Sequence, residues 1–179
     1  VNEAELAEWS RALRWRGHRM VAAPEHADVM VLNTCAVTVD ATRRSRRVVR
    51  QLHRANPLSK LVVTGCYAEL EADAIRALVE GDRALADLVV GNRDKDHIVE
   101  LLDGIDVAAP MASDLEAQPE HEPLAFDQHP GRTRAFVKVQ DGCRHRCSYC
   151  IVTVARGQER SRPIADVVTQ VRELYAAGY

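Results

Sequence analysis

The chain has 179 residues, of which 46% are hydrophobic and 28% are charged, and its formal net charge is -2. This composition is typical of a globular protein, and the length allows one domain and part of another. No apolar run approaches the roughly 20 residues of a transmembrane helix, so we expect no membrane partner. Five cysteines, an odd number, favour metal ligation in a reducing cytoplasm over disulfides.

The hydrophobic pattern of the first hundred residues alternates between helices and strands. Leu6, Trp9 and Leu13 lie at helical spacing and predict a surface helix over 2–16, followed by a short strand over 20–23. Continuous apolar runs predict buried parallel strands over 29–32, 61–64 and 88–90. Helices are predicted after these strands, from the N-cap Thr38 to Pro57, over about 71–79 and over 94–102. This order predicts an α/β fold with an open parallel sheet of flavodoxin type.

Two cysteines each lie just past the end of a predicted strand. Cys35 follows Asn33-Thr34, and Cys66 follows Thr64-Gly65. The carboxyl ends of parallel strands form the functional edge of such a sheet, so these two thiols can come close together although 31 positions separate them. Alternatively, both are small buried hydrophobic residues.

The composition changes after residue 103. Seven acidic residues and no lysine or arginine lie between Asp103 and His129, and four prolines lie between 103 and 132. We interpret 104–132 as an interdomain linker, whose acidity can reflect solvation alone. Beyond it, alternation over 134–140 predicts a strand, and Val167, Val168, Val171 and Leu174 predict a helix over 164–177.

Three thiols between that strand and that helix form the most specific motif of the chain. Cys143, Cys147 and Cys150 have the spacing Cys-x3-Cys-x2-Cys, which can hold one cuboidal iron-sulfur cluster from a single loop. Three ligands for four irons leave one iron open to a substrate. A zinc site is the alternative and would need a fourth ligand such as His145.

The cysteine loop resembles the signature of radical S-adenosylmethionine enzymes, in which S-adenosylmethionine chelates the open iron. Tyr149 stands where that superfamily carries an aromatic residue near the adenine. Together with Asn33-Thr34-Cys35 and Thr64-Gly65-Cys66, the loop makes the chain similar to the methylthiotransferases. The resemblance implies a second [4Fe-4S] cluster on Cys35, Cys66 and a cysteine upstream of Val1. It also implies an N-terminal domain over 1–103 and the first strand-helix unit of a radical S-adenosylmethionine (β/α) barrel over 133–179.

The activity implied by this resemblance is radical transfer of a methylthio group, supported by an electron donor that reduces the cluster. The sequence after Cys35, with Ala36-Val37-Thr38 and Arg44-Ser45-Arg46, is similar to the branch that acts on N6-threonylcarbamoyladenosine at position 37 of tRNA. The alternatives are isopentenyladenosine-37 tRNA, an aspartate of a ribosomal protein, or, from another class, a non-catalytic zinc or RNA-binding module. Because a complete barrel needs roughly 200 residues or more, we expect the isolated chain not to turn over.

Two groups of arginines are candidates for contact with tRNA. One group shares a face of the helix that follows Cys35 and comprises Arg43, Arg47, Arg50 and Arg54. The other follows the cysteine loop and comprises Arg156, Arg160 and Arg162. The first group can instead be a solvated helix face, and the second can instead pair with acids of the barrel.

Overall fold

The computed structural model describes residues 2–80, 83–105 and 135–179. Three of its strands, β1 (Val29–Thr34), β2 (Lys60–Gly65) and β5 (Leu88–Val90), form a parallel sheet in the order β1-β2-β5. The α/β class with an open parallel sheet is therefore confirmed, and the flavodoxin type stays a prediction. In the register of the first two strands, Thr34 lies opposite Gly65, so both strands end at the same level.

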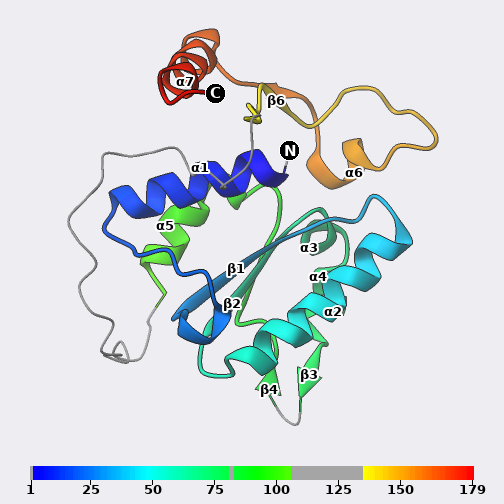
Figure 1. Cartoon of the computed structure of the whole chain (residues 1–179). Helices are drawn as coiled ribbons and strands as arrows, with labels where there is room; N and C mark the ends of the chain where they lie inside the picture. The colour runs from blue at the N-terminus through cyan, green and yellow to red at the C-terminus, as the bar shows by residue number, and fades with distance from the viewer. Residues whose placement is uncertain (1, 81–82, 106–134) are drawn as a thin grey trace.

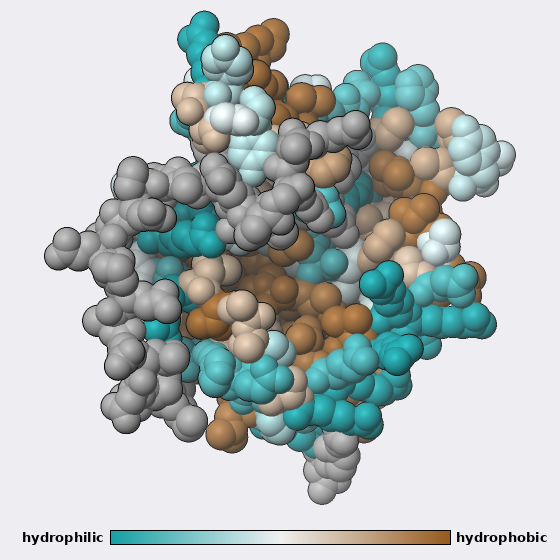
Figure 2. All heavy atoms as spheres, in the orientation of Figure 1, coloured by the Kyte–Doolittle hydropathy of each residue, from teal (hydrophilic) through white to brown (hydrophobic). Residues whose placement is uncertain are grey.

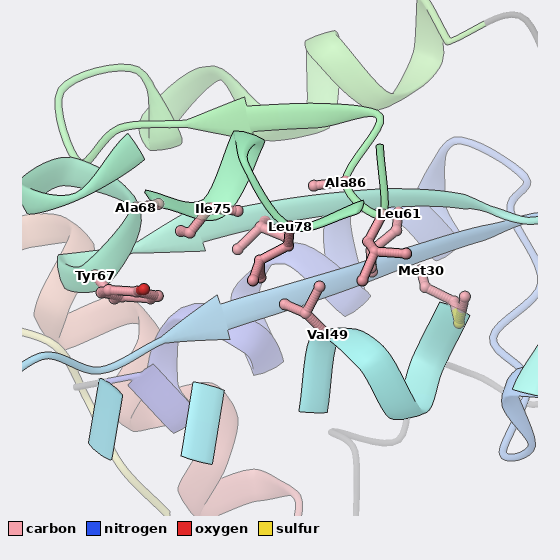
Figure 3. Close-up of a cluster of buried hydrophobic side chains, with 10 residues drawn as sticks. Met30, Val49, Leu61, Tyr67, Ala68, Ile75, Leu78 and Ala86 are labelled. Atoms are coloured by element: carbon pink, nitrogen blue, oxygen red, sulfur yellow. The ribbon is translucent and has the colours of Figure 1, made fainter. Parts of the chain in front are cut away.

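Helices cover both faces of this sheet, which explains the continuous apolar strands (Figure 1). On one face, Leu61 and Val63 of β2 pack with Val49 of α2 (Val39–Ala55) and with the buried Tyr67 (Figure 3). On the other face, Val62 packs with residues of α1 (Asn2–Trp15) and α5 (Ile98–Asp103). Alternate residues of one strand thus serve two cores.

The long predicted helices form where the pattern placed them. In α1, Trp9 and Leu13 are buried, whereas Leu6 is 38% exposed. The N-terminus of α2 is capped by Thr38, whose hydroxyl accepts a hydrogen bond from the Ala41 amide at 3.1 Å. The last helix, α7, spans Ile164–Ala176.

Several short elements differ from the predictions. The structure contains no strand over 20–23; the 3-10 helix η1 (Pro24–His26) follows instead. Of the helix predicted over 71–79, only α4 (Ala72–Arg76) forms, and the preceding helix α3 (Cys66–Leu70) was not predicted. Glu71 separates the two helices because its dihedral angles are not helical. A hairpin of β3 (Val79–Glu80) and β4 (Arg83–Ala84) was not predicted, and the helix over 94–102 begins as the 3-10 helix η2 (Lys95–His97).

The C-terminal segment forms less strand than predicted. Residues 135–140 of the strand expected over 134–140 are described, and of these only Gln140 is in a strand, β6 (Gln140–Asp141), which pairs antiparallel with β7 (Arg160–Ser161). Strands need hydrogen-bonded neighbours, and within the described residues β7 is its one partner. Between them lie the cysteine loop and α6 (Val152–Arg156), which contacts α3 of the sheet domain. Most of the predicted linker over 104–132 lies outside the described residues.

Candidate metal centre

Cys35 and Cys66 follow the paired ends of two neighbouring strands. Because Thr34 and Gly65 are opposite in register, the next residue of each strand, a cysteine in both cases, leaves the sheet at the same edge. Cys66 is buried and begins α3, and Cys35 is half-buried. The Thr34 hydroxyl donates to the Thr64 carbonyl and accepts from the Ala68 amide at 3.3 Å, which ties this edge to α3.

The chain can turn into α3 because residue 65 is glycine. Its φ of 96° and ψ of -169° lie in a region that side chains other than glycine rarely adopt. A Cβ atom at this position would also clash with the backbone oxygen and nitrogen of Thr34. The tight approach of the two strand ends therefore depends on Gly65, immediately before Cys66.

Buried polar atoms without partners belong to residues that are close to both cysteines in the sequence. Asn33 Oδ1, Thr64 Oγ1 and Tyr67 Oη are buried and have no hydrogen-bond partner among the described residues. Each belongs to a residue within two positions of Cys35 or Cys66. Most buried polar atoms in proteins are hydrogen-bonded, so orphaned atoms on residues close to two thiols in the sequence fit an edge that binds a further group.

Backbone hydrogen bonds hold the cysteine loop at its start and near its end. The Cys143 amide donates to the Gly157 carbonyl at 3.1 Å, and the Cys150 amide donates to the Cys147 carbonyl at 3.0 Å. Gly142 precedes the loop with a φ of 70°, and a Cβ atom there would clash with the backbone of Gln158. Cys147 is exposed, Cys143 and Cys150 are half-buried, and Tyr149 is 89% exposed.

The donor set of this loop fits an iron-sulfur cluster, because three thiols project from eight consecutive residues, 143–150. Over the ranges 2–80, 83–105 and 135–179, no three His, Cys, Asp or Glu side chains are gathered as ligands of a metal ion. Metal binding by Cys143, Cys147, Cys150, Cys35 and Cys66 therefore stays a prediction.

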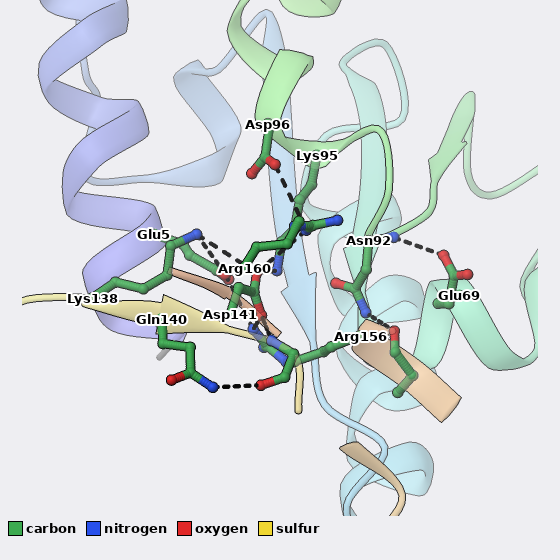
Figure 4. Close-up of polar contacts among 12 residues, drawn as sticks. Glu5, Glu69, Asn92, Lys95, Asp96, Lys138, Gln140, Asp141, Arg156 and Arg160 are labelled. Carbon is green, nitrogen blue, oxygen red and sulfur yellow. Dashed lines mark hydrogen bonds and ion pairs between the residues drawn. The ribbon is translucent and has the colours of Figure 1, made fainter. Parts of the chain in front are cut away.

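A buried cluster of charged side chains joins the sheet domain to the cysteine-loop segment (Figure 4). Glu5 of α1 forms an ion pair with Lys95 of η2, with 2.6 Å between Lys95 Nζ and Glu5 Oε1. Asp141 of β6 pairs with the same lysine at 2.9 Å and with Arg156 of α6 at 2.9 Å. Lys138 approaches Glu5 at 3.4 Å and Asp141 at 3.7 Å. We call these five residues the charge cluster.

The charge cluster reaches one of the candidate ligands. Arg156 donates from Nε to Cys66 Sγ at 3.2 Å and from Nη1 to Glu5 Oε1 at 3.2 Å. Burial by itself would lower the pKa of Arg156, but the hydrogen bond to Asp141 and the nearby negative groups raise that pKa above its usual value. Burial opposes the charged forms of Glu5 and Asp141 too, yet the hydrogen bond from Lys95 helps lower both pKa values.

The predicted arginines divide into exposed and inward-facing residues. Arg43, Arg47, Arg50 and Arg54 are exposed on α2, and hydrophilic side chains gather over this helix in Figure 2. Arg43 pairs with Asp40 at 3.5 Å, so this arginine has an acidic neighbour on its own helix.

In the second group, the Arg156 side chain is only 9% exposed. Its guanidinium is turned into the charge cluster, which argues against the expected RNA contact. Arg160 lies near Asp96 at 3.7 Å, and Arg162 donates to the Lys138 carbonyl at 3.1 Å and to Gln170 at 2.6 Å.

The charge cluster was not predicted from the sequence, although one signal for it was present. Glu5, Trp9 and Leu13 recur every four residues, so the buried stripe of α1 begins with a carboxylate rather than with Leu6. A buried acid requires a cationic partner, but nothing local identifies Lys95 or Arg156 as that partner.

The structure thus combines a parallel sheet that has cysteines at its carboxyl edge with a Cys-x3-Cys-x2-Cys loop docked against it. Comparison with known proteins shows that the chain is homologous to the radical S-adenosylmethionine methylthiotransferases. Residues 1–91 match the family model described as "Uncharacterized protein family UPF0004", and the chain belongs to this family.

Named relatives of different specificity match the chain. "Threonylcarbamoyladenosine tRNA methylthiotransferase MtaB" of Chlamydia pneumoniae is 35% identical over 180 residues, covering 100% of this chain and 39% of that protein. "Ribosomal protein uS12 methylthiotransferase RimO" of Synechococcus sp. (strain CC9605) is 32% identical, covering 90% of this chain and 34% of that protein. "tRNA-2-methylthio-N(6)-dimethylallyladenosine synthase" of Chlorobium luteolum is 31% identical, covering 100% and 40%. The chain thus spans about two fifths of the length of these relatives.

None of the helices in the described ranges has the length and apolar character needed to cross a membrane.

Proposed function

We propose that this chain is part of a two-cluster radical S-adenosylmethionine enzyme that adds a methylthio group to C2 of N6-threonylcarbamoyladenosine at position 37 of tRNA. One observation carries the proposal: the loop of Cys143, Cys147 and Cys150 is docked, through the α6–α3 contact and the charge cluster, against the sheet edge that bears Cys35 and Cys66. A transferase that joins a sulfur source to a radical generator requires two such sites close together.

In this proposal the two sets of cysteines have separate roles. Cys143, Cys147 and Cys150 hold one [4Fe-4S] cluster and leave one iron for S-adenosylmethionine, with Tyr149 near the adenine. Cys35 and Cys66 hold the second cluster, from which sulfur is delivered. The bound cofactors would supply the radical chemistry after reduction by an electron donor, while these residues would hold the cofactors and position the reactants.

A further ligand from upstream of Val1 is consistent with the sheet. Within the described residues β1 pairs only with β2, and hydrophobic side chains gather over β1 in Figure 2. A strand preceding α1 can pair with this open edge and place a third cysteine beside Cys35. The proposed division into 1–103, the linker 104–132 and the barrel unit 133–179 is part of the same proposal.

The exposed face of α2 supplies the proposed tRNA contact. Arg43, Arg47, Arg50 and Arg54 extend over more than three turns of a helix that begins just after Cys35. Closely spaced cations of this kind suit the phosphates of an RNA backbone, and they would hold the substrate near the cysteine edge. Arg160 and Arg162 are part of the same proposed contact with tRNA, whereas Arg156 is turned into the charge cluster.

Mass spectrometry of tRNA nucleosides tests the substrate. Full-length protein, reconstituted with iron and sulfide, is supplied with S-adenosylmethionine, a reductant and tRNA that carries either N6-threonylcarbamoyladenosine or isopentenyladenosine. The proposal predicts the 2-methylthio product from the first tRNA, its absence in a Cys143→Ala variant, and no turnover by the 179-residue chain alone. Product from the second tRNA alone would reassign the substrate to isopentenyladenosine-37 tRNA.

A further inference from the structure

Arg156 lies where the two candidate cluster sites meet. It ends α6, six positions after Cys150, and its Nε donates to the sulfur of Cys66 at 3.2 Å. The same guanidinium contacts Glu5 at 3.2 Å and Asp141 at 2.9 Å through Nη1. One side chain from the cysteine-loop segment therefore reaches a ligand of the sheet domain.

The direction of the Nε–H bond is fixed by the carboxylates. A guanidinium is planar and its donors have a fixed geometry, so the two acids that hold Nη1 also determine where Nε points. Both acids are in turn held by Lys95, a residue of η2 whose side chain is 1% exposed. Asp141 lies two positions before Cys143, so the same contact anchors the start of the cysteine loop.

The backbone beside Arg156 is held as well. The buried Asn92 side chain donates to the carbonyl of Ala155, and the Asn92 amide donates to Glu69 at 2.8 Å. Glu69 belongs to α3, three positions after Cys66. Two independent connections thus join the helix that begins at Cys66 to the helix that follows the cysteine loop.

The charges of the cluster suit a negatively charged sulfur. Its five side chains comprise three cations, Lys95, Lys138 and Arg156, and two carboxylates. A cysteine that ligates a metal does so as the thiolate, which carries a negative charge. A thiolate at Cys66 would balance these five charges and would strengthen the hydrogen bond from Nε.

We propose that Arg156 is a positioning residue that couples the two cluster sites, by fixing the Cys66 sulfur relative to the cysteine loop and by donating a hydrogen bond to that sulfur when it ligates iron. The inference rests on the proposed function. Hydrogen bonds to ligand sulfurs are one determinant of the reduction potential of an iron-sulfur cluster. A donor favours the more negative, reduced state, so its loss makes the potential of the Cys66-bound cluster more negative.

The test measures that potential in full-length protein whose other site is removed by Cys143→Ala, Cys147→Ala and Cys150→Ala. Electron paramagnetic resonance during a redox titration follows the remaining cluster in Arg156→Gln and Arg156→Lys. The matched control is Arg144→Gln, which removes a 72% exposed charge from the same segment. We expect a shift to more negative potential in both Arg156 variants and none in the control. An unchanged potential in both would overturn the proposal.

Iron content separates this inference from the function on which it rests. If the triple-alanine protein binds no iron that depends on Cys66, the proposed function fails at this site and the inference fails with it. If iron binds and the reduction potential of the Cys66-bound cluster does not change when Arg156 is replaced, the inference alone fails. Should Arg156→Gln not fold, Arg156→Lys decides, because it keeps a positive charge beside Glu5 and Asp141 but cannot direct an Nε–H donor to the sulfur.

Discussion

Lys95 and Glu5 form an ion pair of 2.6 Å in which each side chain is only 1% exposed, although 90 positions separate them. The pair joins α1 to η2 beneath the segment that carries the cysteine loop. Burial of two charges is costly, and the cost is offset here by further hydrogen bonds, including one from Asn33 to Glu5 at 3.0 Å. The charge cluster is therefore sensitive to the loss of any one partner.

Replacing Lys95 by methionine tests this sensitivity. The substitution removes one of the three cations that Glu5 and Asp141 share and leaves Lys138 and Arg156 in place. Loss of one partner from a buried ion pair typically costs roughly 3 to 5 kcal/mol. Urea unfolding of the 179-residue chain measures the change in the free energy of unfolding. The control is Arg76→Gln, which removes an exposed i,i+3 pair with Asp73 and should have little effect. Equal effects of the two substitutions would show that the buried pair is unimportant for stability.

Stability should fall in acid because of the same carboxylates. The pKa values of Glu5 and Asp141 are lowered below their ordinary values of 4.5 and 3.8. Their stabilising contribution is therefore complete above these ordinary values and is lost as the pH falls below them, toward the lower pKa values of the folded state. Thermal unfolding between about pH 6 and pH 2 measures this loss. Asp141→Asn should make the decrease of the melting temperature shallower, and an unchanged pH profile would contradict this assignment.

Gly65 and Gly157 provide a matched pair for the cysteine edge. Both have positive φ, 96° and 74°, with ψ near 180°, so alanine costs about 1 to 3 kcal/mol of backbone strain at either position. Only at Gly65 would the new Cβ also clash with Thr34, whereas nothing lies within 4 Å at Gly157. Gly65→Ala should consequently destabilise the chain more than Gly157→Ala in urea unfolding. The reverse order would indicate that the strand ends are not packed as described.

The basic face of α2 predicts a salt-dependent interaction with tRNA. Arg47→Glu combined with Arg50→Glu should weaken binding and reduce the slope of log affinity against log salt by about 0.7 to 0.9 for each arginine–phosphate pair that the substitutions remove. Fluorescence anisotropy with labelled tRNA at several salt concentrations measures both quantities. Arg76→Glu, on α4 and not on the α2 helix, serves as the control. A slope that does not change would leave α2 as a solvated helix.

The strands of the sheet could be predicted because their signal is local. Three apolar runs between turn residues were sufficient to place β1, β2 and β5, and strand order then placed Cys35 and Cys66 at one edge. The short helix α3 was not predicted, because its five residues directly after β2 are too few to show a helical pattern. The strand predicted over 20–23 does not form, because an apolar pattern cannot by itself supply a hydrogen-bonded strand partner.

The contacts of the candidate site were not predicted, because they depend on tertiary structure. Arg156 was expected to face RNA or acids of the barrel, since its neighbours Arg160 and Arg162 made the segment look uniformly basic. It does pair with one acid of that segment, Asp141, but its partners Glu5 and Cys66 are 151 and 90 positions away. Long-range pairs of this kind are set by the docking of α6 on α3, which no pattern within either helix specifies.

Anaerobic reconstitution with iron and sulfide, with zinc assayed in parallel, is the decisive experiment for the cysteine loop. We expect about four irons per chain on this loop, absent in Cys143→Ala, with an absorption spectrum that changes when S-adenosylmethionine is added. One tightly bound zinc and no iron would contradict the proposed function and would identify the loop of Cys143, Cys147 and Cys150 as a zinc-binding module instead.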